Sequence, residues 1–208
     1  MPPELSSDQR RRLAQNLADV HGRIAEAAAR CGRAPAEVKL VAVTKYVDAT
    51  TTRTLVDQGC RALGESRPQD LWRKAEALAD MPIEWHMIGH LQRNKVERTM
   101  ACVGWLHSGD SLRLLEAVDQ QCAKIGRRLP VLIEVNVSGD ASKHGFAPDD
   151  VEPNLESLAK LKQVEVRGLM AMARREGDTN AARHDFARLR VLREQLAQVS
   201  PPEFHWNE

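Results

Sequence analysis

Apolar and β-branched residues recur along this chain in two patterns. The first is a nearly continuous apolar run, Val38-Lys39-Leu40-Val41-Ala42-Val43-Thr44-Lys45, which is typical of a strand buried on both faces of a parallel sheet. The second is a spacing of three and four residues, which predicts an amphipathic first helix along Leu13, Leu17, Val20, Ile24 and Ala28. Ser7 and Asp8 are candidate caps at the start of this helix, and Gly32 can end it.

The two patterns alternate along the rest of the chain. We predict strands at 38–44, 61–64, 83–88, 103–107, 130–137, 164–170 and 203–206. We predict helices between them at 50–59, 67–79, 91–100, 111–125, 148–161 and 179–198. Repeated βα units of this length form either a doubly wound sheet or a TIM-type barrel, and seven strands without a GxGxxG motif favour the barrel. The predicted fold is an α/β barrel with an extra N-terminal helix.

The length of the chain modifies this prediction. A TIM barrel has roughly 250 residues and eight strands, whereas this chain has 208 residues and its seventh predicted strand lies at its end. We expect a single domain, residues 1–208, that lacks the eighth strand and helix. Because an unpaired strand edge invites pairing with another chain, we expect a monomer if the barrel is complete and an edge-paired oligomer if it is truncated.

Composition and charge narrow the class of protein. With 30 Lys and Arg against 29 Asp and Glu, the formal net charge is +1, so no nucleic-acid-binding surface is indicated. The four cysteines are scattered without a CxxC pair, which argues against a zinc knuckle or a disulfide framework. No apolar stretch approaches the roughly 18 residues of a membrane span, and the N-terminus has no signal-peptide core. We expect a cytoplasmic protein with small-molecule or protein partners.

Lys45 stands out because it ends the most apolar of the predicted strands. In α/β sheets, ligands and catalytic groups gather at the carboxyl ends of strands. A partly desolvated lysine can lose its proton near neutral pH, and the neutral amine attacks a carbonyl to form a Schiff base. The alternative is a lysine that caps the strand and extends its amine into water.

Functional groups also follow most of the other predicted strands, and such a ring of strand ends favours the functional reading of Lys45. They are Glu65 and Ser66, His86 to His90, His107 and Ser108, Asn136 and Ser138, Met170 to Met172, and His205 and Asn207. The loop at 136–146 is rich in turn formers and is expected to form part of the rim, where Lys143 and His144 either touch a ligand or are solvated.

Neither a metal site nor a catalytic arrangement is predicted. His86 and His90 have the spacing of a helical metal pair, but Gly89 and the apolar alternation place His86 on a strand, where that spacing fails. No Ser/His/Asp order, paired-carboxylate motif or Walker-type loop accompanies Lys45. We therefore assign no catalytic residues.

The chain resembles the pyridoxal phosphate homeostasis protein family, single-domain relatives of the alanine racemase barrel. The resemblance rests on LVAVTK at 40–45, LGESR at 63–67, WHMIGHLQRNK at 85–95, IEVNVS at 133–138 and GLMAM at 168–172. It implies that Lys45 binds pyridoxal 5′-phosphate (PLP) through a Schiff base, with Ser66, His86 and Met170 beside the cofactor. It also implies a non-catalytic carrier that buffers PLP and delivers it to PLP-dependent apo-enzymes.

Two features depart from the family's pattern. Many members carry Gly-Glu-Asn where this chain has Gly64-Glu65-Ser66, and the family's Ser-x-Gly-Met-Ser phosphate loop would follow residue 208. Two other functions therefore stay open. One is a Schiff-base enzyme, such as an amino-acid racemase or lyase, with His86 or His205 as its acid/base group. The other is a truncated module that no longer holds PLP.

Overall fold

A computed structural model describes residues 5–140, 143–173 and 179–208. Its centre is a parallel sheet of six strands in the order β1-β2-β3-β4-β5-β6, so each strand pairs with the next one along the chain. The strands are β1 Ala42–Val43, β2 Ala62–Glu65, β3 Glu84–Met87, β4 Trp105–Gly109, β5 Leu129–Glu134 and β6 Val164–Met170. This sequential order is that of a TIM-type barrel, because a doubly wound sheet reverses its strand order. The predicted barrel-type fold is confirmed.

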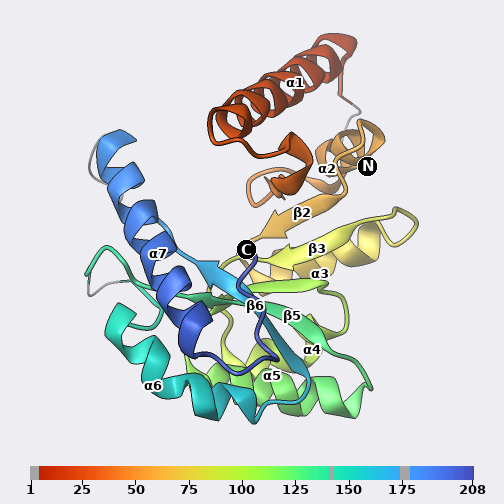
Figure 1. Ribbon diagram of the computed structural model, residues 1–208. Coiled ribbons are helices and arrows are strands. Elements are labelled where there is room, and N and C mark those ends of the chain that lie inside the picture. The colour runs from red at the N-terminus through yellow and green to blue at the C-terminus, as the bar shows by residue number, and fades with distance from the viewer. Residues whose placement is uncertain (1–4, 141–142, 174–178) are drawn as a thin grey trace.

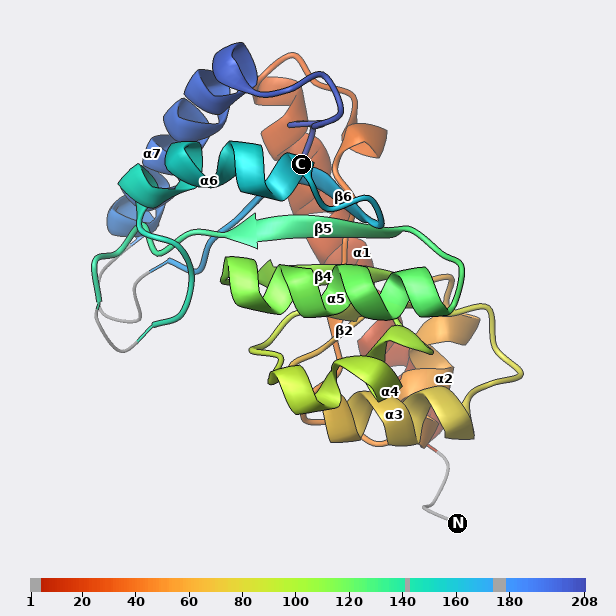
Figure 2. The same cartoon turned by 90° about the horizontal axis from the view of Figure 1, so that it is seen from below.

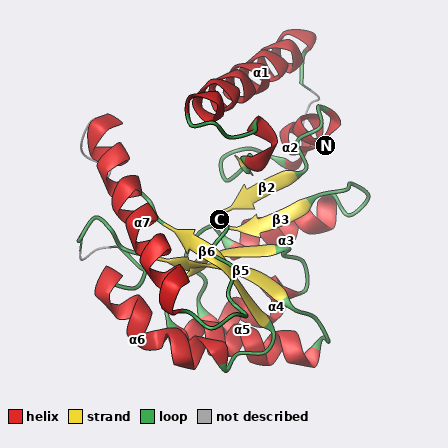
Figure 3. Cartoon of the chain, in the orientation of Figure 1, coloured by secondary structure: helices red, strands yellow, loops and turns green. Residues whose placement is uncertain are grey.

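Helices alternate with the strands and cover the outer face of the curved sheet (Figures 1 and 3). They are α1 Ser7–Arg30, η1 Pro35–Glu37, α2 Ala49–Asp57, α3 Pro68–Ala77, η2 Arg93–Lys95, α4 Val96–Met100, α5 Leu112–Lys124, α6 Pro148–Ala159 and α7 Thr179–Val199. Helices α3, α4 and α5 lie side by side in Figure 2, and their apolar faces pack on the strands. Within the described ranges, every helix is too short or too polar to cross a lipid bilayer.

The N-cap of helix α1 is Ser6, one residue before the predicted caps. The Ser6 hydroxyl accepts a hydrogen bond from the Gln9 backbone amide (3.2 Å), and the Gln9 side chain accepts one from the Ser6 amide (2.8 Å). This capping box satisfies two backbone donors of the first turn. Only Ala28 of α1 is buried, so the helix lies beside the β1 edge of the sheet and contributes little to the core (Figure 1).

Strand β1 is much shorter than the predicted strand at 38–44. It pairs only with β2, and Val43 is 53% exposed, so the prediction of burial on both faces is wrong for this strand. A strand with one neighbour keeps fewer ladder hydrogen bonds, which explains its short length. The predicted helix at 91–100 is likewise divided into the 3₁₀ turn η2 and the short helix α4.

The predicted strand at 203–206 does not form a regular strand. Instead, residues 205–208 run along β6, with hydrogen bonds from the His205 amide to the Val166 carbonyl (3.0 Å) and from the Leu169 amide to the Glu208 carbonyl (3.3 Å). Gly168 permits this approach, because a Cβ atom there would lie 2.1 Å from the Glu208 oxygen. In the described part of the chain this segment does not pair with β1, so the barrel is open between them.

Candidate functional site

Lys45 and Ser66 follow the carboxyl ends of β1 and β2. The register pairs Val43 with Gly64 across the two strands, so Lys45 and Ser66, two residues further on, stand at the same height. Lys45 is exposed, with its Nζ atom 5.0 Å from the centre of the Tyr46 ring. Ser66 is half-buried. The two side chains therefore start from neighbouring points on the rim of the barrel.

Met170 occupies the equivalent position at the end of β6. It pairs in register with Glu134 of β5. Leu132, two residues before Glu134, lines the interior of the barrel, so the alternation of a strand places Glu134 and Met170 on this inner face as well. Three of the four residues predicted to lie beside the cofactor, Lys45, Ser66 and Met170, thus stand at strand ends on one rim.

His86 lies deeper, inside the barrel. Its backbone pairs with Gly64, which places it one step of the pleat below Ser66. The ring is buried and uses both nitrogens: Nδ1 lies 2.8 Å from Nε2 of His107, and Nε2 lies 3.3 Å from Oε2 of Glu84. The cavity beside it has a volume of about 80 Å³, well below the roughly 300 Å³ at which small-molecule pockets begin. His86 forms part of the floor below the rim.

The two histidines belong to a polar chain that runs from the barrel interior to the partly exposed Glu84 and Lys39. Glu84 accepts from the Lys39 amine (2.5 Å) and from the Trp105 indole (3.0 Å), in addition to its contact with His86. Burial lowers the pKa of His107 to about 4, with further lowering from His86 and Lys39, and burial also lowers the pKa of His86. Both rings are therefore neutral at pH 7, and one donates to the other. The sequence indicated both histidines but not their pairing, which depends on the β3–β4 register.

A second buried polar cluster holds the end of β1. The Lys74 amine, from α3, donates to the Thr44 carbonyl (2.6 Å) and to Oε1 of Glu65 (2.5 Å), and the Thr44 hydroxyl donates to the same oxygen (2.7 Å). Thr44 directly precedes Lys45, so this cluster fixes the backbone that carries the lysine. Lys74 is not among the residues predicted from the sequence. The feature that could have revealed Lys74 is its position between Leu71 and Leu78, on the apolar face of a helix.

Ionisable groups also gather at the carboxyl ends of β3, β4 and β5. His90 Nδ1 lies 2.7 Å from Oδ2 of Asp110, and the His90 ring stacks on that of His144, with centres 4.0 Å apart. Burial, together with the nearby Asp110, raises the pKa of Glu134 to about 6. His144 comes from the loop at 136–146, which thus contributes to the rim as expected. In the same loop, the Lys143 amine donates to the Ala173 carbonyl (3.2 Å).

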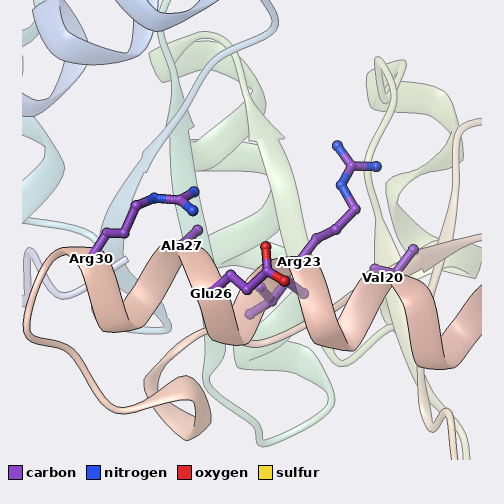
Figure 4. Close-up of a pocket in the computed structure, with 6 residues that line it drawn as sticks. Val20, Arg23, Glu26, Ala27 and Arg30 are labelled. Atoms are coloured by element: carbon purple, nitrogen blue, oxygen red, sulfur yellow. The ribbon is translucent and has the colours of Figure 1, made fainter.

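A separate pocket runs along α1, away from this rim. It is lined by Val20, Arg23, Ile24, Glu26, Ala27 and Arg30. Figure 4 shows the five labelled side chains on one side of the helix. All of its charged side chains are exposed and all its lining comes from one helix, so it lacks the convergent buried polar groups of a ligand site.

Comparison with protein families gives one match over nearly the whole chain. The model of the alanine racemase N-terminal domain matches residues 15–207. Pyridoxal phosphate homeostasis protein of Pseudomonas aeruginosa is 39% identical over 180 residues, which cover 86% of this chain and 78% of the relative. The protein of the same name from Aquifex aeolicus is 36% identical over 182 residues, 88% of this chain and 80% of the relative.

Solved structures show the same similarity in three dimensions. PipY of Synechococcus elongatus, solved with PLP bound, superposes with a TM-score of 0.82 at 31% identity, over 93% of this chain and 85% of that chain. Alanine racemase of Clostridium difficile superposes with a TM-score of 0.64 at 12% identity, over 78% of this chain and 42% of that chain, which is a similarity of fold alone.

Proposed function

This chain belongs to the family of pyridoxal phosphate homeostasis proteins, and we propose that it binds PLP at the mouth of the barrel and holds it for PLP-dependent apo-enzymes. The observation that carries the proposal is the position of Lys45. Its amine stands at the carboxyl end of a barrel strand, on the same rim as Ser66 and Met170. Cofactors in barrels of this kind bind at this end of the strands.

The residues on the rim fit the chemistry of PLP. No carboxylate in the described ranges pairs with the Lys45 amine, which is exposed and free to reach a ligand. Bound PLP would supply an aldehyde, with which the Lys45 amine would form a Schiff base with loss of water. Ser66 offers a hydroxyl group for hydrogen bonding, and Met170 offers an adaptable apolar surface for the ring. The anchored Thr44 keeps the lysine backbone in place.

The geometry favours a carrier over a Schiff-base enzyme. A racemase or lyase needs a second group that exchanges protons with the substrate. His86 is buried with both ring nitrogens in contact with His107 and Glu84. His205 pairs its backbone with Val166, four residues before the carboxyl end of β6, so it lies away from the rim. Neither of the two candidate acid/base groups stands beside Lys45.

Titration with PLP, followed by absorbance, tests this function. We expect the wild-type spectrum to depart from that of free PLP, with saturation at one equivalent per chain, and the change to be absent in Lys45→Ala. Lys124→Ala, at the exposed end of α5, is the matched control and is expected to behave as the wild type. An unchanged PLP spectrum in the wild type would contradict the proposal.

A second assay separates carrier from enzyme. The PLP-loaded protein is incubated with a panel of L-amino acids, and chiral chromatography follows racemisation and loss of the amino acid. We expect no turnover. Turnover that is lost in Lys45→Ala would replace the carrier function with the enzyme function.

A further inference from the structure

Three potential metal ligands converge at the rim from three different loops. His90 follows β3, Asp110 follows β4, and His144 lies in the loop after β5. One ligand atom from each lies within 4.8 Å of the other two. Ligand atoms around a tetrahedral zinc ion lie roughly 3.3 Å apart, given bonds of about 2.0–2.1 Å. The His90 and His144 rings are stacked, so one of them turns to bring its nitrogen to a shared ion.

Each of the three loops is held at its base. Gly89, before His90, accepts a hydrogen bond from the Ser108 hydroxyl (2.7 Å) through its carbonyl. The Asp110 side chain is only 6% exposed, and its Oδ1 accepts from the Ser111 hydroxyl (3.0 Å). His144 is exposed, but the backbone of its loop is anchored just after this residue.

The anchor of the His144 loop is a short bridge to the end of β5. The Phe146 amide donates to the Glu134 carbonyl (2.8 Å), and the Phe146 carbonyl accepts from the Asn136 amide (2.9 Å). Between His144 and Phe146, Gly145 has a φ of +107°, a conformation that suits glycine. The ligands are therefore set on a fixed framework and need little ordering to bind an ion.

Glu134 supplies an independent indication of a cation. It lies at the end of β5 and is 5% exposed. Asp110 follows β4, the neighbour of β5 in the sheet, and its side chain is 6% exposed. Two neighbouring acidic groups in a largely buried setting are costly without a compensating positive charge. A bound cation would compensate both.

We propose that His90, Asp110 and His144 form a binding site for a divalent first-row transition ion of the zinc type. Two imidazoles and one carboxylate suit such an ion, whereas magnesium and calcium prefer oxygen ligands alone. Water fills the remaining coordination positions. This grouping differs from the His86 and His90 pair that the sequence spacing brings to mind, because the structure places His86 inside the barrel, in contact with His107. The site uses none of the residues assigned to PLP, and it goes beyond the proposed function.

Cobalt and zinc titrations of the tag-free protein, without PLP, test the site. Co²⁺ reports on its ligands through its visible absorbance, and calorimetry with Zn²⁺ gives the stoichiometry. We expect one ion per chain, and a loss of affinity of at least about tenfold in both His144→Gln and Asp110→Asn. His21→Gln, on exposed α1, is the matched control and is expected to bind as the wild type.

Circular dichroism of each variant shows that the fold is retained, which we expect for His144→Gln because His144 is exposed. Weak binding at several sites that His144→Gln leaves unchanged would mean an adventitious ion only and would overturn the proposal. The absence of Zn²⁺ binding in the wild type would overturn it as well. Either result would leave PLP binding by Lys45 untouched.

Discussion

Lys74 carries its positive charge into the core and places it on the strand that leads to Lys45. Its amine contacts both Glu65 and the Thr44 carbonyl, and Glu65 is completely buried. Desolvation of two charges is expensive, so such a pair adds little net stability. What the pair adds is position, because it links α3 and β2 to the last backbone carbonyl before Lys45.

Replacement of one member of the Lys74–Glu65 pair separates its effect on stability from its effect on position. We expect Lys74→Met to lower the free energy of unfolding by roughly 3–5 kcal/mol, because Glu65 is left buried without its cation. Lys74→Met combined with Glu65→Leu is expected to recover most of this loss, since neither charge is then buried. Urea unfolding of the wild type, the single variant and the double variant measures the difference. Equal stability of Lys74→Met and the wild type would show that the pair is solvated.

The same double variant tests the positioning of Lys45. It leaves Lys45 intact but removes the contacts to the Thr44 carbonyl and hydroxyl. We expect the double variant to fold and to bind PLP more weakly than the wild type in the absorbance titration. Unchanged PLP affinity in a folded double variant would show that the cluster has only a structural role.

At the scale of elements, two rim loops touch backbone to backbone. A Cβ atom on Gly89, in the loop after β3, would lie 2.3 Å from the carbonyl oxygen of Ser66, in the loop after β2. Such a contact is far inside van der Waals distance, and its oxygen belongs to a backbone that cannot rotate away. The loops that carry Ser66 and His90 are therefore set by this glycine.

A pair of glycine substitutions tests this contact. We expect Gly89→Ala to destabilise the fold by roughly 1–3 kcal/mol, as for overpacked sites. Gly22→Ala, in α1, meets no atom within 4 Å and is expected to stabilise the protein by about 0.5–1 kcal/mol, because alanine favours the helix. Thermal unfolding of both variants provides the comparison. A neutral Gly89→Ala would show that the two loops separate freely.

The order and type of most elements were predictable, because periodicity and capping are local. The prediction of β1 was wrong in length, since the apolar run at 38–44 does not show that its strand has only one neighbour. The clusters around Glu65, His86 and His90 join different strands and loops, so their partners depend on register. The positions of Lys45, Ser66 and Met170 at strand ends were predictable, because Lys45 and Ser66 follow strands and Met170 ends one, and their contact with PLP stays a prediction.

At the scale of the whole molecule, the polar interior of the barrel links stability to pH. Burial holds the pKa of His107 at about 4, below the roughly 6.5 of a free histidine. Between these two values the unfolded chain takes up a proton that the folded chain does not, so stability falls as the pH falls through this window. The groups that face this ring are His86, Glu84 and Lys39, and of their charges only that of Glu84 opposes the shift.

We expect His107 to make the fold roughly 2 kcal/mol less stable at pH 5 than at pH 7.5. His86, whose pKa is also lowered, contributes in the same direction. Urea unfolding at several pH values measures the slope, which is expected to decrease in His107→Gln and to remain in His21→Gln. If His107→Gln does not fold, titration of the His107 ring signal by NMR provides the same test. A ring that titrates near 6.5 would contradict the account.

We propose that Lys45, at the open mouth of the barrel, holds PLP covalently. Borohydride reduction of the PLP-loaded protein makes such a bond permanent, and peptide mass spectrometry then locates it. We predict one reduced PLP adduct per chain, on the peptide that contains Lys45. An adduct on any other lysine, or no adduct at saturating PLP, would contradict the claim.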